Sequence, residues 1–111
     1  MYELVPPKSK LVDFKTILLP GIVFKIKILD FEEDEKYSSL LLKNAREKDG
    51  EFEKDENGHF IIEKDQYYID CFKLFVPEIE GITGKFQPSW QVIKSVVNKA
   101  TMLNSVQEAE K

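Results

Sequence analysis

Five cationic and four aromatic side chains, placed along three stretches of apolar sequence, have the chemistry to hold a nucleic-acid strand. Single-stranded nucleic acid is bound by cations that neutralise phosphates and by aromatic rings that stack on bases. The candidates are Lys25, Lys27, Lys43, Arg46 and Lys73 for the phosphates, and Phe31, Tyr37, Tyr67 and Phe75 for the bases. If each stretch is a β-strand, its period of two places Lys25 and Lys27 on one face of their strand, and Tyr67, Lys73 and Phe75 on one face of theirs. Whether these faces coincide stays open, and an ordinary solvent-facing sheet is the plain alternative.

Two other groupings lack part of what their chemistry needs. Cys71 and His59 would face each other across a hairpin with a three-residue turn. A catalytic thiol also needs an oxyanion site and an orienting group, and one Cys with one His cannot supply the ligands of a structural zinc site. Residues 53–58 resemble part of a calcium loop, but the chain has Glu53 where the pattern needs Asp and Lys64 where it needs Glu. We therefore expect a non-enzymatic protein without catalytic residues, metal or cofactor.

The acidity of the chain is concentrated in residues 30–58. This stretch has 11 acidic and 5 basic residues, a balance of −6, whereas the remainder has 9 acidic and 11 basic residues. Dense carboxylates can dock a basic partner or imitate a phosphate backbone. The alternative function is therefore an acidic protein-interaction module, an adaptor or inhibitor, acting through residues 30–58. The plain explanation of such a run is a solvated loop.

Composition narrows the class of protein. A length of 111 residues suits one domain, and 42% hydrophobic with 32% charged residues is typical of globular proteins. The single cysteine excludes an internal disulfide and fits a reducing compartment. Apolar runs are too short to span a membrane, and the first ten residues do not resemble a signal peptide. We expect a cytoplasmic protein with no membrane partner.

The candidate residues need elements to position them, and the clearest is the alternating stretch 21–31. Ile22, Phe24, Ile26 and Ile28 fall on one side of it, which predicts a strand with one buried face. Residues 1–10 are expected to form an N-terminal arm because of Pro6 and Pro7. Further strands are predicted over residues 11–19, 37–45, 59–64 and 66–76, with a short helix as the alternative over 37–45; turns or loops are predicted over 30–36 and 46–58, a helix over 87–103, and a flexible tail over 104–111.

About five strands and one late helix predict a mainly β protein with one C-terminal helix. The expected architecture is a single small antiparallel barrel over residues 11–103, similar to the oligonucleotide-binding (OB) design. The helix is expected to bury Trp90.

A lysine-bearing strand, charged loops and then the aromatic stretch YYIDCFKLF resemble the OB-type single-stranded DNA-binding proteins of bacteria and their phages. The resemblance covers residues 15–76. It implies a protein that binds single-stranded DNA with little sequence preference, works beside replication or recombination proteins, and forms a homo-oligomer. The chain departs from the family in its late helix, its weakly acidic end and its lack of a glycine-rich linker.

Overall fold

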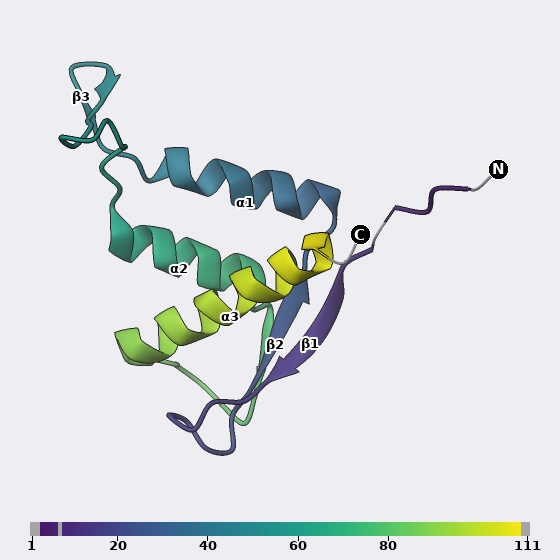
Figure 1. Ribbon diagram of the computed structural model, residues 1–111. Helices are drawn as coiled ribbons and strands as arrows, with labels where there is room; N and C mark the ends of the chain where they lie inside the picture. The colour runs from purple at the N-terminus through teal and green to yellow at the C-terminus, as the bar shows by residue number, and fades with distance from the viewer. Residues whose placement is uncertain (1–2, 7, 110–111) are drawn as a thin grey trace.

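The computed structural model describes residues 3–6 and 8–109 and combines a three-stranded sheet with three helices (Figure 1). The described elements are β1 (Lys10–Phe14), β2 (Val23–Ile28), α1 (Phe31–Lys43), β3 (Glu47–Lys48), β4 (Glu51–Phe52), α2 (Lys64–Phe75), β5 (Glu78–Glu80) and α3 (Trp90–Ala109). The main sheet is antiparallel in the order β1-β2-β5, while β3 and β4 form a separate hairpin. The part of the chain described contains no helix long and apolar enough to cross a membrane.

The prediction of a mainly β, OB-like antiparallel barrel is wrong. Neither sheet closes on itself, and three helices contain more residues than all the described strands together. Only the strands over 11–19 and 21–31 correspond to observed strands, β1 and β2. Over 37–45 the alternative of a helix is the one observed, as part of α1, and the predicted strand over 66–76 is in fact helical. Residues 59–64 form only isolated bridges before α2 begins.

Helix α1 forms because Asp30 and Glu33 make a reciprocal cap at its first turn. The Asp30 carboxylate accepts a hydrogen bond from the Glu33 N–H at 2.9 Å, and the Glu33 carboxylate accepts one from the Asp30 N–H at 3.1 Å. Carboxylates in this first turn and Lys43 in the last turn also suit the helix dipole. The charged stretch predicted as a turn is therefore the start of a helix.

Helix α2 has neighbours on several sides, and beyond its first two residues only one stripe of it is polar: Gln66, Asp70 and Lys73. Its Phe75 ring lies 5.1 Å from the Tyr37 ring of α1, and its Phe72 ring lies 6.1 Å from the Phe24 ring of β2. It also packs against α3. A short run that is apolar on both faces fits a buried helix as well as a central strand. This ambiguity explains the wrong prediction for 66–76.

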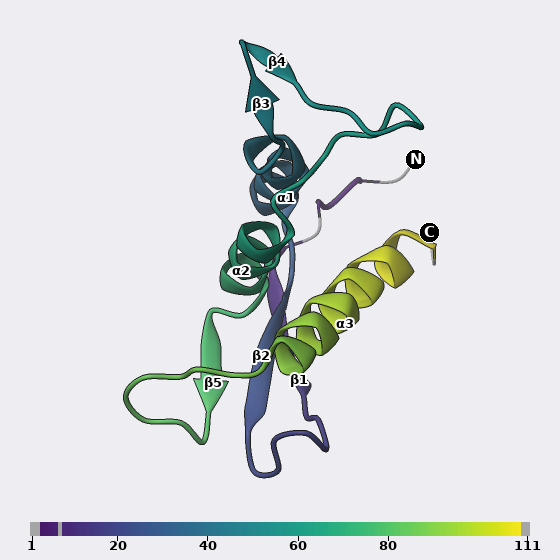
Figure 2. The same cartoon turned by 90° about the vertical axis from the view of Figure 1, so that its left-hand side faces the viewer.

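The core lies between one face of the sheet and the pair α2 and α3 (Figure 2). Phe24, Ile26 and Ile28 of β2 point into it, so the face predicted to be buried in this strand is the buried one. Opposite them lie Phe75 and Cys71 of α2 and Val96 of α3. Helix α1 packs mainly on α2 and extends this layer outward, and its first turn is joined to β2 by the Lys27–Glu33 ion pair.

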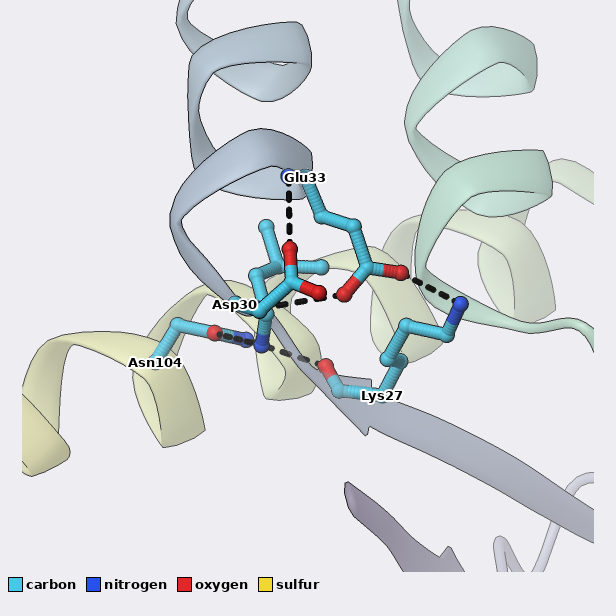
Figure 3. Close-up of polar contacts among 5 residues, drawn as sticks. Lys27, Asp30, Glu33 and Asn104 are labelled. Carbon is cyan, nitrogen blue, oxygen red and sulfur yellow. Dashed lines mark hydrogen bonds and ion pairs between the residues drawn. The ribbon is translucent and has the colours of Figure 1, made fainter. Parts of the chain in front are cut away.

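Helix α3 begins and ends later than the predicted 87–103. Val96, Val97 and Ala100 are buried at helical spacing, and so is Val92, but Trp90 at its start is 42% exposed and not in the core as expected. Asn104, which was assigned to the predicted flexible tail, is anchored. Its side chain accepts a hydrogen bond from the Leu29 N–H at 2.9 Å and donates one to the Lys27 carbonyl at 3.3 Å (Figure 3). Parts of the predicted arm and tail, at residues 1–2, 7 and 110–111, lie outside the described residues.

Candidate interaction surface

The two lysines of the predicted binding strand are already paired with carboxylates of this chain. Lys25 Nζ lies 2.6 Å from Asp13 of β1 and 3.2 Å from Glu80 in the strand on its other side. Hydrogen bonds to Asp13 and then Glu80 raise the pKa of Lys25. Lys27 Nζ lies 2.5 Å from Glu33 at the start of α1. Both lysines thus have carboxylates where the sequence analysis expected phosphates.

The other predicted cations lie outside the main sheet: Lys43 on α1, Arg46 just after it and Lys73 on α2. Lys43 pairs with Asp70 at 3.4 Å, and Arg46 pairs with Glu63 at 2.7 Å. Lys73 is exposed and forms no ion pair with the residues that the structure describes. Four of the five candidate cations are therefore engaged within the chain.

Three of the four predicted stacking rings lie between helices, not on an open sheet. Phe75 is fully buried, and Tyr37 packs on it. Burial, followed by the neighbouring Cys71 and Tyr37, raises the pKa of the partly buried Tyr67. Only Phe31 is widely exposed, at 74% of its surface.

The lysines and the buried rings do not share a trough. Phe24 and Ile26 of β2 point toward the helices. Because successive side chains of a strand point to opposite faces, Lys25 and Lys27 point away from the helices. The rings of Tyr67 and Phe75 belong to the helical layer behind the opposite face. Binding of single-stranded DNA stays a prediction, and the geometry does not gather the residues assigned to it.

The Cys71–His59 and calcium-loop groupings, which are incomplete in the sequence, are not completed within the described residues. Cys71 lies buried in α2, where burial raises the pKa of its thiol, while His59 is exposed between β4 and α2. Across residues 3–6 and 8–109 there is no group of three or more His, Cys, Asp or Glu side chains placed to hold a metal ion. The predicted hairpin that would have joined Cys71 to His59 is not formed.

The outer face of α1 combines exposed apolar side chains with exposed carboxylates. Its inner face turns Tyr37 and Leu40 toward α2, yet none of its thirteen residues is fully buried. On the other side, three apolar side chains face solvent: Phe31 (74% exposed), Leu41 (43%) and Leu42 (49%). We call this surface the α1 outer face, formed by Phe31, Asp34, Glu35, Ser38, Leu41 and Leu42.

Carboxylates border these apolar residues. Glu32, Asp34 and Glu35 are exposed and form no ion pair within the described residues. Acidic residues in a first turn favour the helix through its dipole, which is a sufficient structural reason for the charges alone. That reason does not account for the adjoining apolar side chains.

Both ends of α1 are fixed to the rest of the protein. At its start, Glu33 combines the reciprocal cap with the Lys27 ion pair. At its end, the Asn44 side chain donates to Asp70 at 3.1 Å, and the Asn44 carbonyl accepts from the Glu63 N–H at 2.8 Å. The outer face is thus presented by a helix that is held in place.

The Glu33 contacts predict a pH-dependent contribution to stability. Burial alone would raise the pKa of Glu33, but hydrogen bonds from Lys27 and from the Asp30 N–H lower it below its ordinary value of 4.5. The resulting stabilisation is complete above that value and is lost as the pH falls through the lower folded-state pKa. Glu33→Gln keeps a capping side chain without the charge, and should destabilise the protein by up to about 1 kcal/mol at neutral pH.

Urea unfolding of the wild type and Glu33→Gln at pH 7 and pH 3 tests this prediction. The difference between the two proteins should shrink at pH 3, which lies below the ordinary value of 4.5, because the unfolded chain then takes up a proton at Glu33 and the advantage of the folded carboxylate declines. An equal difference at both pH values would mean that the charge of Glu33 does not stabilise the fold.

Residues 45–62, which we call the excursion, leave the body of the protein at the end of α1 (Figure 1). Main-chain hydrogen bonds join its three extended segments, which contain Arg46, Glu53 and Ile61. The Arg46 N–H donates to the Ile61 carbonyl (2.8 Å), the Glu53 N–H to the Arg46 carbonyl (2.9 Å) and the Ile61 N–H to the Glu53 carbonyl (3.0 Å). The β3–β4 turn uses left-handed backbone at Asp49 and Gly50. The predicted loop therefore has hydrogen-bonded structure of its own.

Comparisons of the chain with protein-family models, curated proteins and solved structures find no match. The resemblance to OB-type single-stranded DNA-binding proteins therefore has no support from a relative, and its expected barrel is not the fold observed.

Proposed function

We propose that this protein is a non-enzymatic interaction module whose α1 outer face binds a basic, partly apolar segment of a partner protein. The observation that supports the proposal most is that Leu41 and Leu42, each almost half exposed, share one side of a helix with Asp34 and Glu35, which form no ion pair within the described residues. Single exposed apolar residues are ordinary on protein surfaces. Several exposed apolar residues next to carboxylates are complementary to a partner helix that carries both apolar and cationic residues.

Pre-organisation favours this surface over a flexible acidic loop. Because Glu33 and Asn44 hold the two ends of α1, binding there need not first order the helix. The carboxylates would raise the association rate with a cationic partner, and this effect would weaken with added salt. The same carboxylates would repel the phosphates of a nucleic acid approaching α1.

A peptide-display selection against the folded protein tests the proposal. Helical peptides that combine Leu or Phe with Lys or Arg should be enriched over acidic and uncharged peptides. In the double variant Leu41→Ser/Leu42→Ser, the affinity of an enriched peptide, measured by fluorescence polarisation, should fall about tenfold or more, because two partly buried leucines are lost from the interface.

Met102→Ser is the matched control, since Met102 on α3 is 50% exposed and lies outside the α1 outer face. It should leave peptide affinity unchanged. Labelled oligo-dT is titrated in parallel at two salt concentrations. Enriched peptides that bind the double variant as tightly as the wild type would overturn the proposal. So would tight, salt-sensitive oligo-dT binding in the absence of any peptide enrichment.

A further inference from the structure

A pair of aromatic rings stands on the excursion, apart from the main core. The ring centroids of Phe52 and Phe60 lie 5.2 Å apart, and the two side chains are 38% and 37% exposed. Neither belongs to the core cluster. With Gly50, Glu51 and Lys54 they line an open depression. Figure 2 shows the β3–β4 hairpin beyond α1, on the side away from the main sheet.

A cation already occupies this aromatic surface. Lys54 Nζ lies 5.6 Å from the centroid of the Phe60 ring, within the range of a cation–π contact. Carboxylates are abundant around it, since residues 47–58 contain six acidic residues and only two basic ones. Nevertheless Lys54 forms no ion pair in the described structure. Its interaction partner is the ring.

We infer that Phe52 and Phe60 form a docking site for an arginine or lysine side chain of a partner protein, and that Lys54 competes for this site from within the chain. Two observations support this. The depression combines two partly exposed rings with a strongly negative neighbourhood, which complements a cation. The internal ammonium group on Phe60 shows that a cation fits there. Arginine is the preferred occupant because its flat, weakly hydrated guanidinium stacks on rings better than an ammonium does.

This inference rests on the proposed function, because it identifies a second contact made by the same basic partner. The α1 outer face would hold apolar residues of the partner segment, and the ring pair would hold one of its cations. The α1 outer face and Phe52 belong to the acidic region 30–58, Phe60 lies two residues beyond it, and the excursion continues directly from the end of α1.

An NMR titration with three acetylated peptides, Gly-Arg-Gly-Arg-Gly and its Lys and Gln counterparts, tests the inference. The Arg peptide should shift the ring signals of Phe52 and Phe60 most, the Lys peptide less, and the Gln peptide not at all. Lys54→Met removes the competitor and should tighten binding of the Arg peptide about two- to fivefold. Phe60→Leu should abolish the shifts while the main-chain signals of the excursion persist.

Lys48→Met is the matched control for charge, because Lys48 is exposed on β3 and has no ring contact among the described residues. It removes the same charge as Lys54→Met and should change affinity much less. Equal effects of the two substitutions, or equal shifts with the Gln peptide, would overturn the inference.

The variant Leu41→Ser/Leu42→Ser separates this inference from the proposed function. It should leave the Arg-peptide shifts at Phe52 and Phe60 unchanged, while weakening the longer peptides selected on α1. If selected peptides depend on α1 but the ring pair ignores the Arg peptide, the inference fails alone. If the ring pair responds but no selected peptide depends on α1, the proposed function fails.

Discussion

Replacing Phe75 by alanine is expected to lower the free energy of unfolding by about 3–5 kcal/mol, the usual cost of removing a buried phenylalanine ring. Phe75 is fully buried near the end of α2 and touches the Tyr37 ring of α1, within the core that also includes α3 and β2. Its loss would leave a cavity where the helical layer meets the sheet. A domain of this size has a total stability of only about 5–15 kcal/mol, so the variant should be partly unfolded under mild conditions.

Phe31→Ala provides the matched control. It is the same chemical change in the same helical layer, but Phe31 is 74% exposed at the first position of α1. The expected change is within about 0.5 kcal/mol. Urea unfolding followed by circular dichroism measures both variants. A neutral Phe75→Ala would contradict the described core and would return Phe75 to the role of an exposed stacking residue.

Phe75 was predicted on a strand and lies buried in a helix, and the comparison of α2 with β2 shows why part of this fold could be predicted from sequence and part could not. Strand β2 was predictable because Phe24, Ile26 and Ile28 alternate with polar or less apolar residues, and one side of a strand is buried. Helix α2 was not, because its aromatic residues suit a central strand as well as a buried helix, and its polar stripe has only three residues, Gln66, Asp70 and Lys73.

Helix α1 did have a usable signal. The pair Asp30 and Glu33 forms the spacing of a capping box directly before Tyr37, Leu40 and Leu41. The density of charge around this pair indicated a solvated turn instead. Capping geometry depends on two side chains three residues apart, whereas net charge averages over the segment and hides it.

The ion-pair partners of the candidate site residues could not be predicted from sequence patterns. Lys25 and Lys27 lie on one strand face as predicted, but their partners come from other elements: Asp13 and Glu80 lie on the two neighbouring strands, and Glu33 lies on the following helix. Sequence patterns give the face of a residue within its own element. They do not give the residue opposite it, and that residue decides whether a lysine is available to a phosphate.

The exposed apolar row on α1 could not be separated from a core face in the sequence for the same reason. Leu40, Leu41 and Leu42 are consecutive, and only the position of α2 determines that Leu40 packs inward while the other two face solvent. The proposed interaction surface therefore follows from how two helices meet.

The link between α3 and the end of β2 gives the second prediction with a large effect on stability. Asn104→Leu is expected to lower the free energy of unfolding by about 2–4 kcal/mol, because it leaves two main-chain groups without partners: the Leu29 N–H and the Lys27 carbonyl. These groups lie where β2 ends and the chain turns to begin α1 (Figure 3). Asn104 thus couples the last helix to the helix that carries the proposed interaction surface.

Hydrogen exchange locates the effect, because the Leu29 amide should lose its protection in Asn104→Leu before the amides at the centre of β2 do. Asn98→Leu on the same helix is the control: Asn98 is exposed and its side chain has no hydrogen bond within the described residues, so stability should change little. If Asn104→Leu were as mild as Asn98→Leu, the end of β2 would be held by neighbouring packing alone. The Lys27–Glu33 pair would then be the main polar link between the sheet and the start of α1.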